Sequence, residues 1–366
     1  NTWRECFKMK KITSLLLLLA SMMVLMGAGA AAAPKVTVFK FAHDNSPDPL
    51  SSSQQAFAMV FKNLVESKTN GQIKVEIFPA GALGKIRERL ELIQVNAIQG
   101  TLSSIGGITQ FIPEIGALDV PFAIQDYAVA HRVYDGPFLD ELRKAVASKI
   151  PGARLLTVAE AGGFYAITNN VRPIKSPSDM KGLKFRTMEV PVQMKMFEAL
   201  GAAAVPIAYP ELYTSLQTGV IAGQTNPVPI VVDGRFYEVQ KYLTLTNHLY
   251  GTDWFVVSDK FLKGLTESQR YIIYEAAQTA TIASRGLLRI IESSSKGSDF
   301  LSQHGVQIYS PTQDELQEFR NMAVPAVKRF ISDKYGKAGD EWADKFLAAI
   351  KQAEQQLAAE AKTAVK

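Results

Sequence analysis

Two kinds of apolar spacing, one typical of a strand and one typical of a helix, alternate from residue 36 to residue 95. An apolar run at 36–41 predicts a strand, and 51–67 places its large apolar residues at helical spacing. The segment 73–77 alternates apolar and charged residues with period two, which predicts a half-buried strand, and 87–95 is the next predicted helix. Because strands and helices alternate, this part of the chain predicts an α/β fold with a largely parallel sheet.

A second series of the same kind begins near residue 157. Its predicted strands are 164–168, 183–186, 203–207 and 220–224, and its predicted helices are 192–200 and 211–217. A further strand at 254–258 precedes long helical segments, predicted at 267–295, 312–335 and 341–364. Two α/β lobes with a cleft between them are the simplest account, and the helix at 267–295 is long enough to brace both.

The N-terminal segment has the pattern of a secretory signal peptide. Two lysines after Met9 precede an unbroken apolar run from Ile12 to Met26, and small residues follow. This run is shorter than the roughly twenty residues of a membrane-spanning helix, so a retained anchor is the weaker alternative. We expect cleavage after Ala32, which also removes an upstream extension at 1–8. The mature protein is then exported, and the bacterial periplasm is its expected location.

The numbers of cysteines and of charged residues argue against several classes of function. The only cysteine, Cys6, lies in the removed segment, so the mature chain is expected to have no disulfide, thiolate metal site or cysteine nucleophile. The 366 residues carry a formal charge of +5, but segment 1–32 holds four basic residues against one acidic residue. The remainder is therefore close to neutral and gives no basis for expecting a nucleic-acid partner. With 47% hydrophobic residues, the chain is long enough for about two domains.

The sequence is poor in catalytic and metal-binding motifs. The four histidines are far apart, and no His-Glu-x-x-His motif or Gly-x-Ser-x-Gly elbow occurs. Gly81-Ala-Leu-Gly84-Lys85 is similar to a phosphate-binding loop only in part, because its spacing differs and no Lys-Ser or Lys-Thr pair follows. We therefore expect no enzyme, no cofactor and no metal site. A catalytic group assembled across the fold stays an alternative.

Two polar residues stand at predicted strand ends in the second lobe. Arg186 ends a short apolar strand directly before a helix, where open α/β sheets bind their ligands. Its guanidinium can hold a carboxylate through two parallel hydrogen bonds, the strong charge-assisted form, and a structural salt bridge is the alternative. Asn226 likewise follows a strand and can donate and accept at once. Its alternative is a turn-forming role before Pro227.

An ordered set of motifs carries a resemblance to a known family. The motifs are Phe39-Lys-Phe-Ala-His43, Phe78-Pro-Ala-Gly-Ala-Leu-Gly84, Met180-Lys-Gly-Leu-Lys-Phe-Arg186, Ala208-Tyr209-Pro-Glu211-Leu-Tyr213, Leu216-Gln-Thr-Gly219 and Phe236-Tyr-Glu-Val-Gln-Lys-Tyr-Leu243. Each motif is weak alone, but the ordered set is specific and extends from about Val36 to about Asp333. The chain resembles the substrate-binding proteins of TRAP transporters, the tripartite ATP-independent periplasmic importers of organic acids.

The resemblance implies a two-lobed, venus-flytrap binding protein of the α/β class, with crossover strands and a long helix shared by both lobes. The implied division is 1–32 (removed), 33–162 (lobe I), 163–251 (lobe II), 252–291 (return to lobe I with the long helix) and 292–366 (return to lobe II with the C-terminal helices). Such a protein captures an organic acid anion and delivers it to the small and large membrane subunits of a permease driven by an ion gradient. A sensory binding protein that signals to a receptor kinase is one alternative, and a periplasmic enzyme is another.

The resemblance also assigns ligand contacts in lobe II. Arg186 matches an arginine that usually forms a salt bridge with the ligand carboxylate, and Asn226 matches an asparagine that commonly contacts the ligand. Tyr209 matches an aromatic residue that packs on the ligand, with a core position as its alternative. Many members have a second arginine where this chain has Tyr165. Because a phenol cannot replace a fixed charge, we expect a monocarboxylate whose apolar or aromatic part lies against Tyr165, Tyr209 and Phe164.

Lobe I is expected to supply further contacts at its strand ends. His43 and Asp44 end the opening strand, and Ser104 follows the apolar stretch that begins near Ile98, so the strand-end rule places them at the cleft. Turn capping and loop hydrogen bonding are the alternatives for these three residues. Arg87 stands at a helix start where the family frequently has arginine. Its role is either a ligand contact or an ion pair that braces the lobes.

Overall fold

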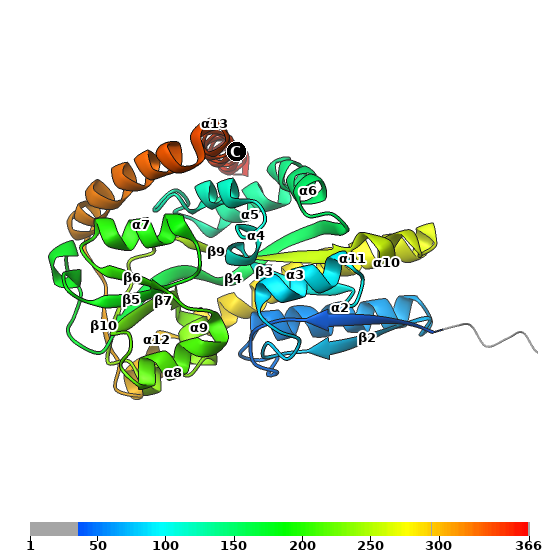
Figure 1. The fold of residues 1–366 in the computed structure, drawn as a ribbon, viewed down its shortest axis with the longest axis horizontal. Helices are drawn as coiled ribbons and strands as arrows, with labels where there is room; N and C mark the ends of the chain where they lie inside the picture. The colour runs from blue at the N-terminus through cyan, green and yellow to red at the C-terminus, as the bar shows by residue number, and fades with distance from the viewer. Residues whose placement is uncertain (1–35, 294, 365–366) are drawn as a thin grey trace, which may run out of the picture. The chain divides into compact units, whose positions relative to one another are not determined.

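The computed structural model describes residues 36–293 and 295–364, and the body of the fold begins at Val38. The expected signal peptide and its cleavage site lie outside the described residues. Strands and helices alternate in the first part of the chain, as predicted (Figure 1). These elements are β1 (Thr37–Ala42), α2 (Ser53–Lys68), β2 (Ile73–Phe78), α3 (Ile86–Gln94), β3 (Gly100–Ser104), α4 (Ile105–Ile108), η1 (Pro113–Asp119), α5 (Tyr127–Asp135) and α6 (Phe138–Lys149).

A 17-residue strand, β4 (Ala153–Asn169), then leads into the second series. That series comprises η2 (Pro177–Met180), β5 (Lys184–Thr187), α7 (Pro191–Ala199), β6 (Ala203–Pro206), η3 (Tyr209–Glu211), α8 (Leu212–Gln217), β7 (Gly223–Pro227), α9 (Val228–Asp233), η4 (Phe236–Glu238) and β8 (Tyr242–Thr244). The predicted elements are present, although β7 begins three residues later than the predicted strand at 220–224. We call the half around β1–β3 lobe I and the half around β5–β8 lobe II.

The chain returns through β9 (Tyr250–Ser258) and ends in helices. The remaining elements are α10 (Asp259–Lys263), α11 (Glu267–Glu292), α12 (Ser298–Gln303), β10 (Gln307–Tyr309) and α13 (Gln313–Ala364). Gly336 breaks α13 with φ 56° and ψ −145°, between the two helices predicted at 312–335 and 341–364. The part of α13 before this break packs on lobe II around α7, whereas the part after it packs on α5 and α6 of lobe I. Segment 292–366, which the resemblance assigns to lobe II, therefore reaches both lobes.

The sheet is mixed, which corrects the expectation of a largely parallel sheet. Its main strand order is β2-β1-β3-β9-β4-β7-β5-β6, with β8 on β4 and β10 on β8. Parallel pairing holds within each lobe, for β1 with β3 and for β5 with β6 and β7. The crossover strands β4 and β9 pair antiparallel with each other and with their neighbours. Local periodicity cannot predict this reversal, because it depends on a strand that returns from the other lobe.

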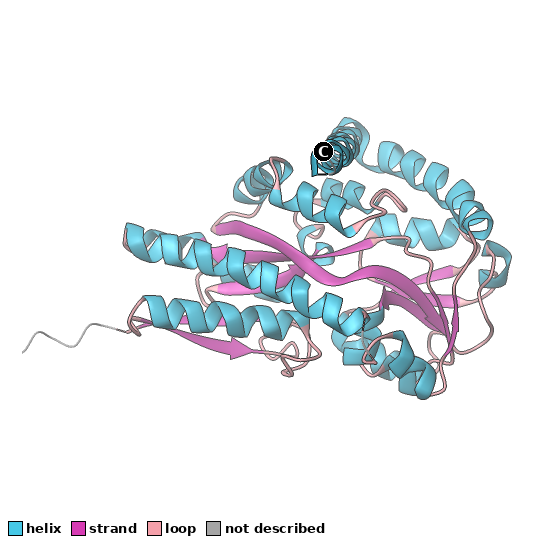
Figure 2. Cartoon of the chain, turned by 180° about the vertical axis from the view of Figure 1, so that it is seen from behind, coloured by secondary structure: helices cyan, strands magenta, loops and turns pink. Residues whose placement is uncertain are grey.

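Apolar clusters cover both faces of the sheet. In lobe I, phenyl rings from two strands and one helix pack together, with Phe41 stacked on Phe255 at 5.0 Å between ring centroids and Phe61 5.1 Å from Phe255. The helices α2 and α11 lie side by side over this cluster (Figure 2). The last part of α11 also approaches α9 of lobe II, so this helix contacts both lobes.

A glycine pair redirects β4 where it passes from lobe I to lobe II. Gly162 and Gly163 have φ values of 80° and 94°, and the register of β4 against β9 shifts between Glu160 and Phe164. A Cβ atom on Gly162 would lie 2.7 Å from Ile230, so a larger residue fits neither the backbone nor the space. This bulge decides which side chains of the second half of β4 face lobe II and its cleft.

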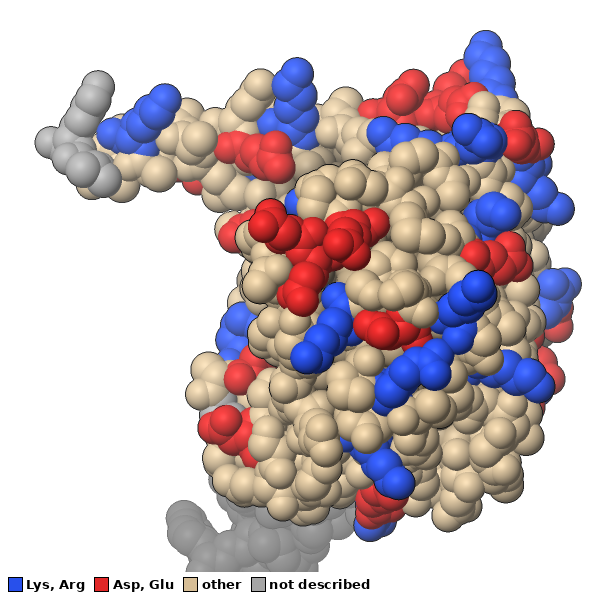
Figure 3. All heavy atoms as spheres, turned by 90° about the vertical axis from the view of Figure 1, so that its left-hand side faces the viewer, with Lys and Arg blue, Asp and Glu red and all other residues tan. Residues whose placement is uncertain are grey.

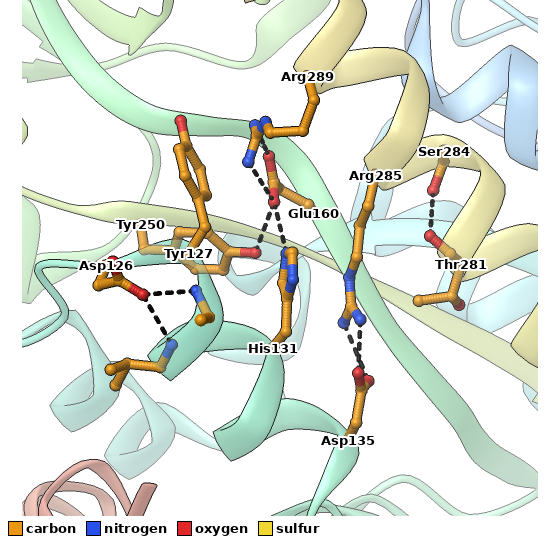
Figure 4. Close-up of polar contacts among 12 residues, drawn as sticks. Asp126, Tyr127, His131, Asp135, Glu160, Tyr250, Thr281, Ser284, Arg285 and Arg289 are labelled. Carbon is orange, nitrogen blue, oxygen red and sulfur yellow. Dashed lines mark hydrogen bonds and ion pairs between the residues drawn. The ribbon is translucent and has the colours of Figure 1, made fainter. Parts of the chain in front are cut away.

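An ion cluster surrounds Glu160 directly before this bulge, and we call it the Glu160 cluster (Figure 4). The Glu160 side chain is fully buried and forms an ion pair with Arg289 of α11. Its Oε2 also accepts a hydrogen bond from the Tyr250 hydroxyl (2.9 Å) and lies 3.0 Å from His131 Nε2 of α5. One turn earlier on α11, Arg285 donates to both carboxylate oxygens of an α5 aspartate at 2.6 and 3.0 Å. The cluster therefore ties β4, α5 and α11 together.

Charges of both signs are interspersed on the end of lobe II. Figure 3 shows the face on the left of Figure 1, where basic and acidic side chains alternate and one acidic group gathers near the top. The described residues of this face form no continuous basic surface of the kind that binds a nucleic-acid backbone.

Candidate functional site

A cavity of about 250 Å³ lies between the lobes. Lobe I contributes residues at the ends of β1 and β3 and at the start of α3, and β9 contributes Asp253. Lobe II contributes residues of β5 and β7, the first turn of α9 and the segment before and within η3. The volume is below the range of drug-sized ligand sites, so the cavity suits a small molecule.

Arg186 supplies a buried positive charge to this cavity. It lies on β5, is 2% exposed, and donates through Nε to the carbonyl oxygen of Ile207 at 2.8 Å. In the described part of the chain no carboxylate pairs with its guanidinium, and its two terminal nitrogens have no hydrogen-bond partner. Burial lowers the pKa of Arg186 to about 10, so the group remains charged at neutral pH. A buried charge without a counter-ion is unfavourable, and an anion that enters the cavity relieves this.

A chain of amide and hydroxyl groups orients Asn226 at the end of β7. Its Nδ2 donates to Gln224 Oε1 (2.5 Å), and Gln224 Nε2 donates to Thr168 Oγ1 (2.9 Å). The Thr168 hydroxyl in turn donates to Gln240 Oε1 (2.9 Å). Among the described residues, this order leaves the side-chain oxygen of Asn226 and one of its side-chain N–H groups free for a molecule in the cavity.

Two tyrosines line the same cavity. Tyr165 comes from β4 directly after the bulge, and its ring packs edge-on against His248, with 6.0 Å between ring centroids. Tyr209 begins η3 and packs edge-on against Phe236, also at 6.0 Å. Burial raises the pKa of both phenols, so both are neutral and offer a ring and a hydroxyl group but no charge.

Three of the lobe I candidates also line the cavity. Asp44 accepts one hydrogen bond at 2.6 Å from each terminal nitrogen of Arg89, a fully buried arginine, and its charge is therefore balanced. The Ser104 hydroxyl is buried and has no hydrogen-bond partner among the described residues. Arg87 is about half exposed (53%) and pairs with Glu91 on its own helix, so it does not brace the lobes.

Two predicted contacts lie elsewhere. His43 is buried beneath the cavity wall, where its Nε2 lies 2.8 Å from Gln55 Oε1 and burial lowers its pKa to about 4. Phe164 does not line the cavity, although its neighbour Tyr165 does. Its ring packs against Tyr127 at 4.7 Å between centroids and lines a second pocket.

Two polar residues of the lobe I wall were not predicted from the sequence. Asp253 lies on β9 and Gln54 lies in the first turn of α2, and the Gln54 amide donates through Nε2 to Asp253 Oδ1 at 2.9 Å. The available signal was a single carboxylate, Asp253, within the otherwise uncharged strand 250–258. Gln54 gave no signal, because a polar residue at a helix start is ordinary.

Hydrogen bonds and an ion pair join the lobes around the cavity. Asp233 at the end of α9 accepts from the Ser46 hydroxyl (2.5 Å), the Ser51 hydroxyl (3.2 Å) and Asn45 Nδ2 (3.1 Å) of lobe I. Lys85 of lobe I pairs with Glu211 of lobe II at 2.6 Å. These contacts hold the two walls together over the enclosed space.

Comparison with known proteins decides which kind of molecule this is. The model of the family "Bacterial extracellular solute-binding protein, family 7" (DctP) matches residues 41–334. The chain belongs to the DctP family. A solute-binding protein of Verminephrobacter eiseniae is 36% identical to it over 292 residues, which cover 79% of this chain and 84% of that protein. The 2,3-diketo-L-gulonate-binding periplasmic protein of Escherichia coli is 32% identical over 258 residues, 70% of this chain and 77% of that protein.

Solved structures show the same architecture. The crystal structure of a TRAP periplasmic solute-binding protein from Polaromonas, bound to D-erythronate, matches with a TM-score of 0.78 and 33% identity. The match covers 86% of this chain and 98% of that one. The two-lobed α/β fold and the relation to TRAP solute-binding proteins are thereby confirmed. DctP proteins take part in transport and are not enzymes, and the same holds for this member.

Among residues 36–293 and 295–364, no three His, Cys, Asp or Glu side chains are grouped so that they can hold a metal ion. None of the helices in the described part of the chain is both long and apolar enough to cross a bilayer.

Proposed function

We propose that this DctP protein captures a small monocarboxylate in the cavity between its lobes and binds the ligand carboxylate through Arg186. One observation carries the proposal: a 2% exposed guanidinium lines the cavity and has no acidic partner among the described residues. An arginine that serves the fold alone is expected to have a carboxylate beside it, as Arg89 has Asp44.

The charges of the lining favour a single anionic group on the ligand. The other basic residues of the lining, Lys85 and Arg87, are about half exposed and pair with Glu211 and Glu91. Tyr165 stands where the family resemblance implies a second arginine in many members, and its buried phenol carries no charge. A second carboxylate therefore lacks a cation of its own in this cavity.

Apolar side chains support the prediction that part of the ligand is apolar. Tyr165 and Tyr209 contribute ring surface to the lining, and Met188, Ile207 and Ile230 contribute aliphatic surface. Relatives with named ligands include proteins for 2,3-diketo-L-gulonate and D-erythronate, which have one carboxylate, and proteins for C4-dicarboxylates and succinate, which have two. These names support a small organic acid, and the preference for a monocarboxylate rests on the charges of the lining.

Membership in the DctP family supports an extracytoplasmic role. We propose that segment 1–32 is a cleaved signal peptide and that the mature chain works in the periplasm. Ligand contacts to both lobes favour the closed arrangement over an open one, as binding to one of two states requires. The closed complex then presents its ligand to the small and large membrane subunits of a TRAP permease.

A binding screen with an Arg186→Lys variant tests the proposal. Ligand-free protein, obtained by unfolding, dialysis and refolding, is titrated calorimetrically with monocarboxylates, dicarboxylates, sulfonates and neutral sugars. We expect a monocarboxylate to bind most tightly, and Arg186→Lys to weaken it by about 10-fold to 100-fold, because lysine keeps the charge but loses the planar pair of donors.

Arg235→Lys is the matched control, since it makes the same chemical change at an exposed arginine that pairs with Glu238 outside the cavity. Its affinity should equal that of the parent. Tightest binding of a neutral sugar, or an Arg186→Lys variant with unchanged affinity, contradicts the assignment of Arg186 to the ligand carboxylate.

A further inference from the structure

Asp253 is held in the lobe I wall through one carboxylate oxygen, and its other oxygen has no partner among the described residues. The carbonyl oxygen of the Gln54 side chain accepts from the backbone N–H groups of Asp44 (3.0 Å) and Asn45 (3.2 Å). Since these N–H groups can only donate, the orientation of the Gln54 amide is fixed and its Nε2 must face Asp253 Oδ1. Asp253 Oδ2 has no hydrogen-bond partner within the described ranges, although the residue is only 2% exposed and lines the cavity.

Ser104 presents a second unsatisfied polar group beside Asp253. The two residues are direct partners in the antiparallel pairing of β3 with β9, so their side chains leave the sheet on the same face. Both line the cavity, and the buried Ser104 hydroxyl lacks a partner among the described residues. Arg186 comes from β5 in the other lobe. The cavity thus has a cationic wall in lobe II and a hydrogen-bonding wall on β3 and β9.

We infer that Asp253 selects the ligand by hydrogen bonding to a hydroxyl group on the part of the acid that extends from Arg186 toward lobe I. The inference rests on the proposed function, because the carboxylate on Arg186 fixes which end of the ligand reaches Asp253. The ligand class is therefore a hydroxy monocarboxylate, and a bare hydrocarbon acid of the same shape is rejected.

A hydroxyl group matches Asp253 in either protonation state. Burial raises the pKa of Asp253 to about 7, so both forms are populated near neutral pH. The ionised form only accepts hydrogen bonds, whereas the protonated form also donates, and a hydroxyl group can both donate and accept. A second ligand carboxylate is repelled by the ionised form. A methyl group leaves Asp253 Oδ2 and the Ser104 hydroxyl buried without partners, which a site built for hydrogen bonds rejects strongly.

Matched pairs of acids test this selection in the full mature chain. One pair is D-erythronate and butanoate, which share a four-carbon skeleton, and the other is pantoate and its dideoxy analogue 3,3-dimethylbutanoate. Calorimetry on ligand-free protein should show the hydroxylated member of at least one pair binding about 100-fold more tightly than the bare acid. Asp253→Leu should weaken the hydroxylated acid by about 10-fold to 100-fold and leave the bare acid unchanged or tighter. Asp253→Asn, which keeps the shape and one acceptor, should lie between.

Asp119 offers a matched control in the same protein. It is also a buried aspartate whose pKa burial raises to about 7, and it accepts from one glutamine, Gln193, at 2.7 Å. It borders a space of only about 10 Å³, which is too small for any of these acids. Asp119→Asn should therefore keep the preference of the parent for hydroxylated acids.

The outcomes separate this inference from the proposed function. If the parent prefers the bare acids, binds neither member of either pair, or keeps its preference in Asp253→Leu and Asp253→Asn, the role of Asp253 is wrong while Arg186 can still hold a carboxylate. If no acid of the wider screen binds the parent, the proposed function itself fails. Melting temperatures of all variants show whether each is folded. If Asp253→Leu is not folded, the result for Asp253→Asn decides the test.

Discussion

Two regions of this protein accommodate wholly or partly buried arginines in opposite ways. In the Glu160 cluster, Arg289 pairs with Glu160, and neighbouring Arg285 holds an aspartate through two hydrogen bonds (Figure 4). Arg289 also pairs with Glu292. In the cavity, Arg186 is more deeply buried than either and has only the carbonyl oxygen of Ile207 as a partner among the described residues. The first region satisfies its charges internally, and the second leaves one charge for a ligand.

The difference separates a stabilising role from a binding role. Charges that meet their partners within the fold hold β4, α5 and α11 in one arrangement where the chain crosses between lobes. An unpaired cation in an enclosed cavity instead lowers the stability of the empty protein and raises its affinity for an anion. Removing a charge should therefore have opposite effects on stability in the two regions.

The largest effect on stability is expected from Glu160→Gln. This change keeps the shape of a fully buried side chain but removes the charge that pairs with Arg289 and lies beside His131. Arg289 keeps Glu292 as a second partner, but the charge-assisted contacts of a fully buried carboxylate are lost, so the free energy of unfolding should fall by about 2 kcal/mol. Urea denaturation measures it. Glu141→Gln, at an exposed acid that pairs with two lysines, is the control and should leave the midpoint in place.

A smaller effect of opposite sign is expected from Arg186→Met in the absence of ligand. Methionine retains most of the apolar stem and removes a desolvated charge that has no counter-ion, so the empty protein should gain about 1 kcal/mol. The same substitution at Arg285, which removes a paired charge, should destabilise it. Thermal denaturation of refolded, ligand-free protein compares the two. A loss of stability in both variants shows that Arg186 serves the fold, and the contrast between the regions is then wrong.

The smallest effect is expected at the rim of the cavity, from Asp233→Asn. Asp233 accepts hydrogen bonds from Asn45, Ser46 and Ser51 across the lobes, and an amide retains only one of its two acceptor oxygens. Ligand affinity should fall by only a few-fold, about 1 kcal/mol or less, with unchanged unfolding free energy. Small-angle scattering should show a larger radius of gyration for the empty variant. A large loss of unfolding free energy would instead show that Asp233 stabilises the fold, as the charges of the Glu160 cluster do.

Local periodicity located many of the elements, but not α5 and α6, and it did not predict how the strands pair. The helix predicted at 51–67 and the break in the C-terminal helix near Gly336 are both found, because spacing and helix-stopping residues act within a few positions. The antiparallel course of β4 and β9 was not predicted. Strand direction in the sheet depends on which distant segments of the chain pair with one another, and a single sequence does not show those pairs.

The candidate site divides in the same way. Arg186 and Asn226 stand at strand ends that the sequence marks, and the structure places both in one cavity. His43 was proposed by the same strand-end reasoning, but packing holds it outside the cavity. Phe164 was proposed as an apolar contact beside Tyr165, and its ring packs against Tyr127 outside the cavity.

The sequence by itself therefore determined the α/β class, the family, the absence of catalytic motifs and the arginine proposed to hold the ligand. Only the tertiary structure decided that Arg186 has no acidic partner among the described residues and that Asp44 already has one. Only it brought Asp253 and Gln54 to the opposite wall. The physical reason is that burial and charge balance are properties of all the groups around a side chain, and those groups come from segments that the linear sequence keeps apart.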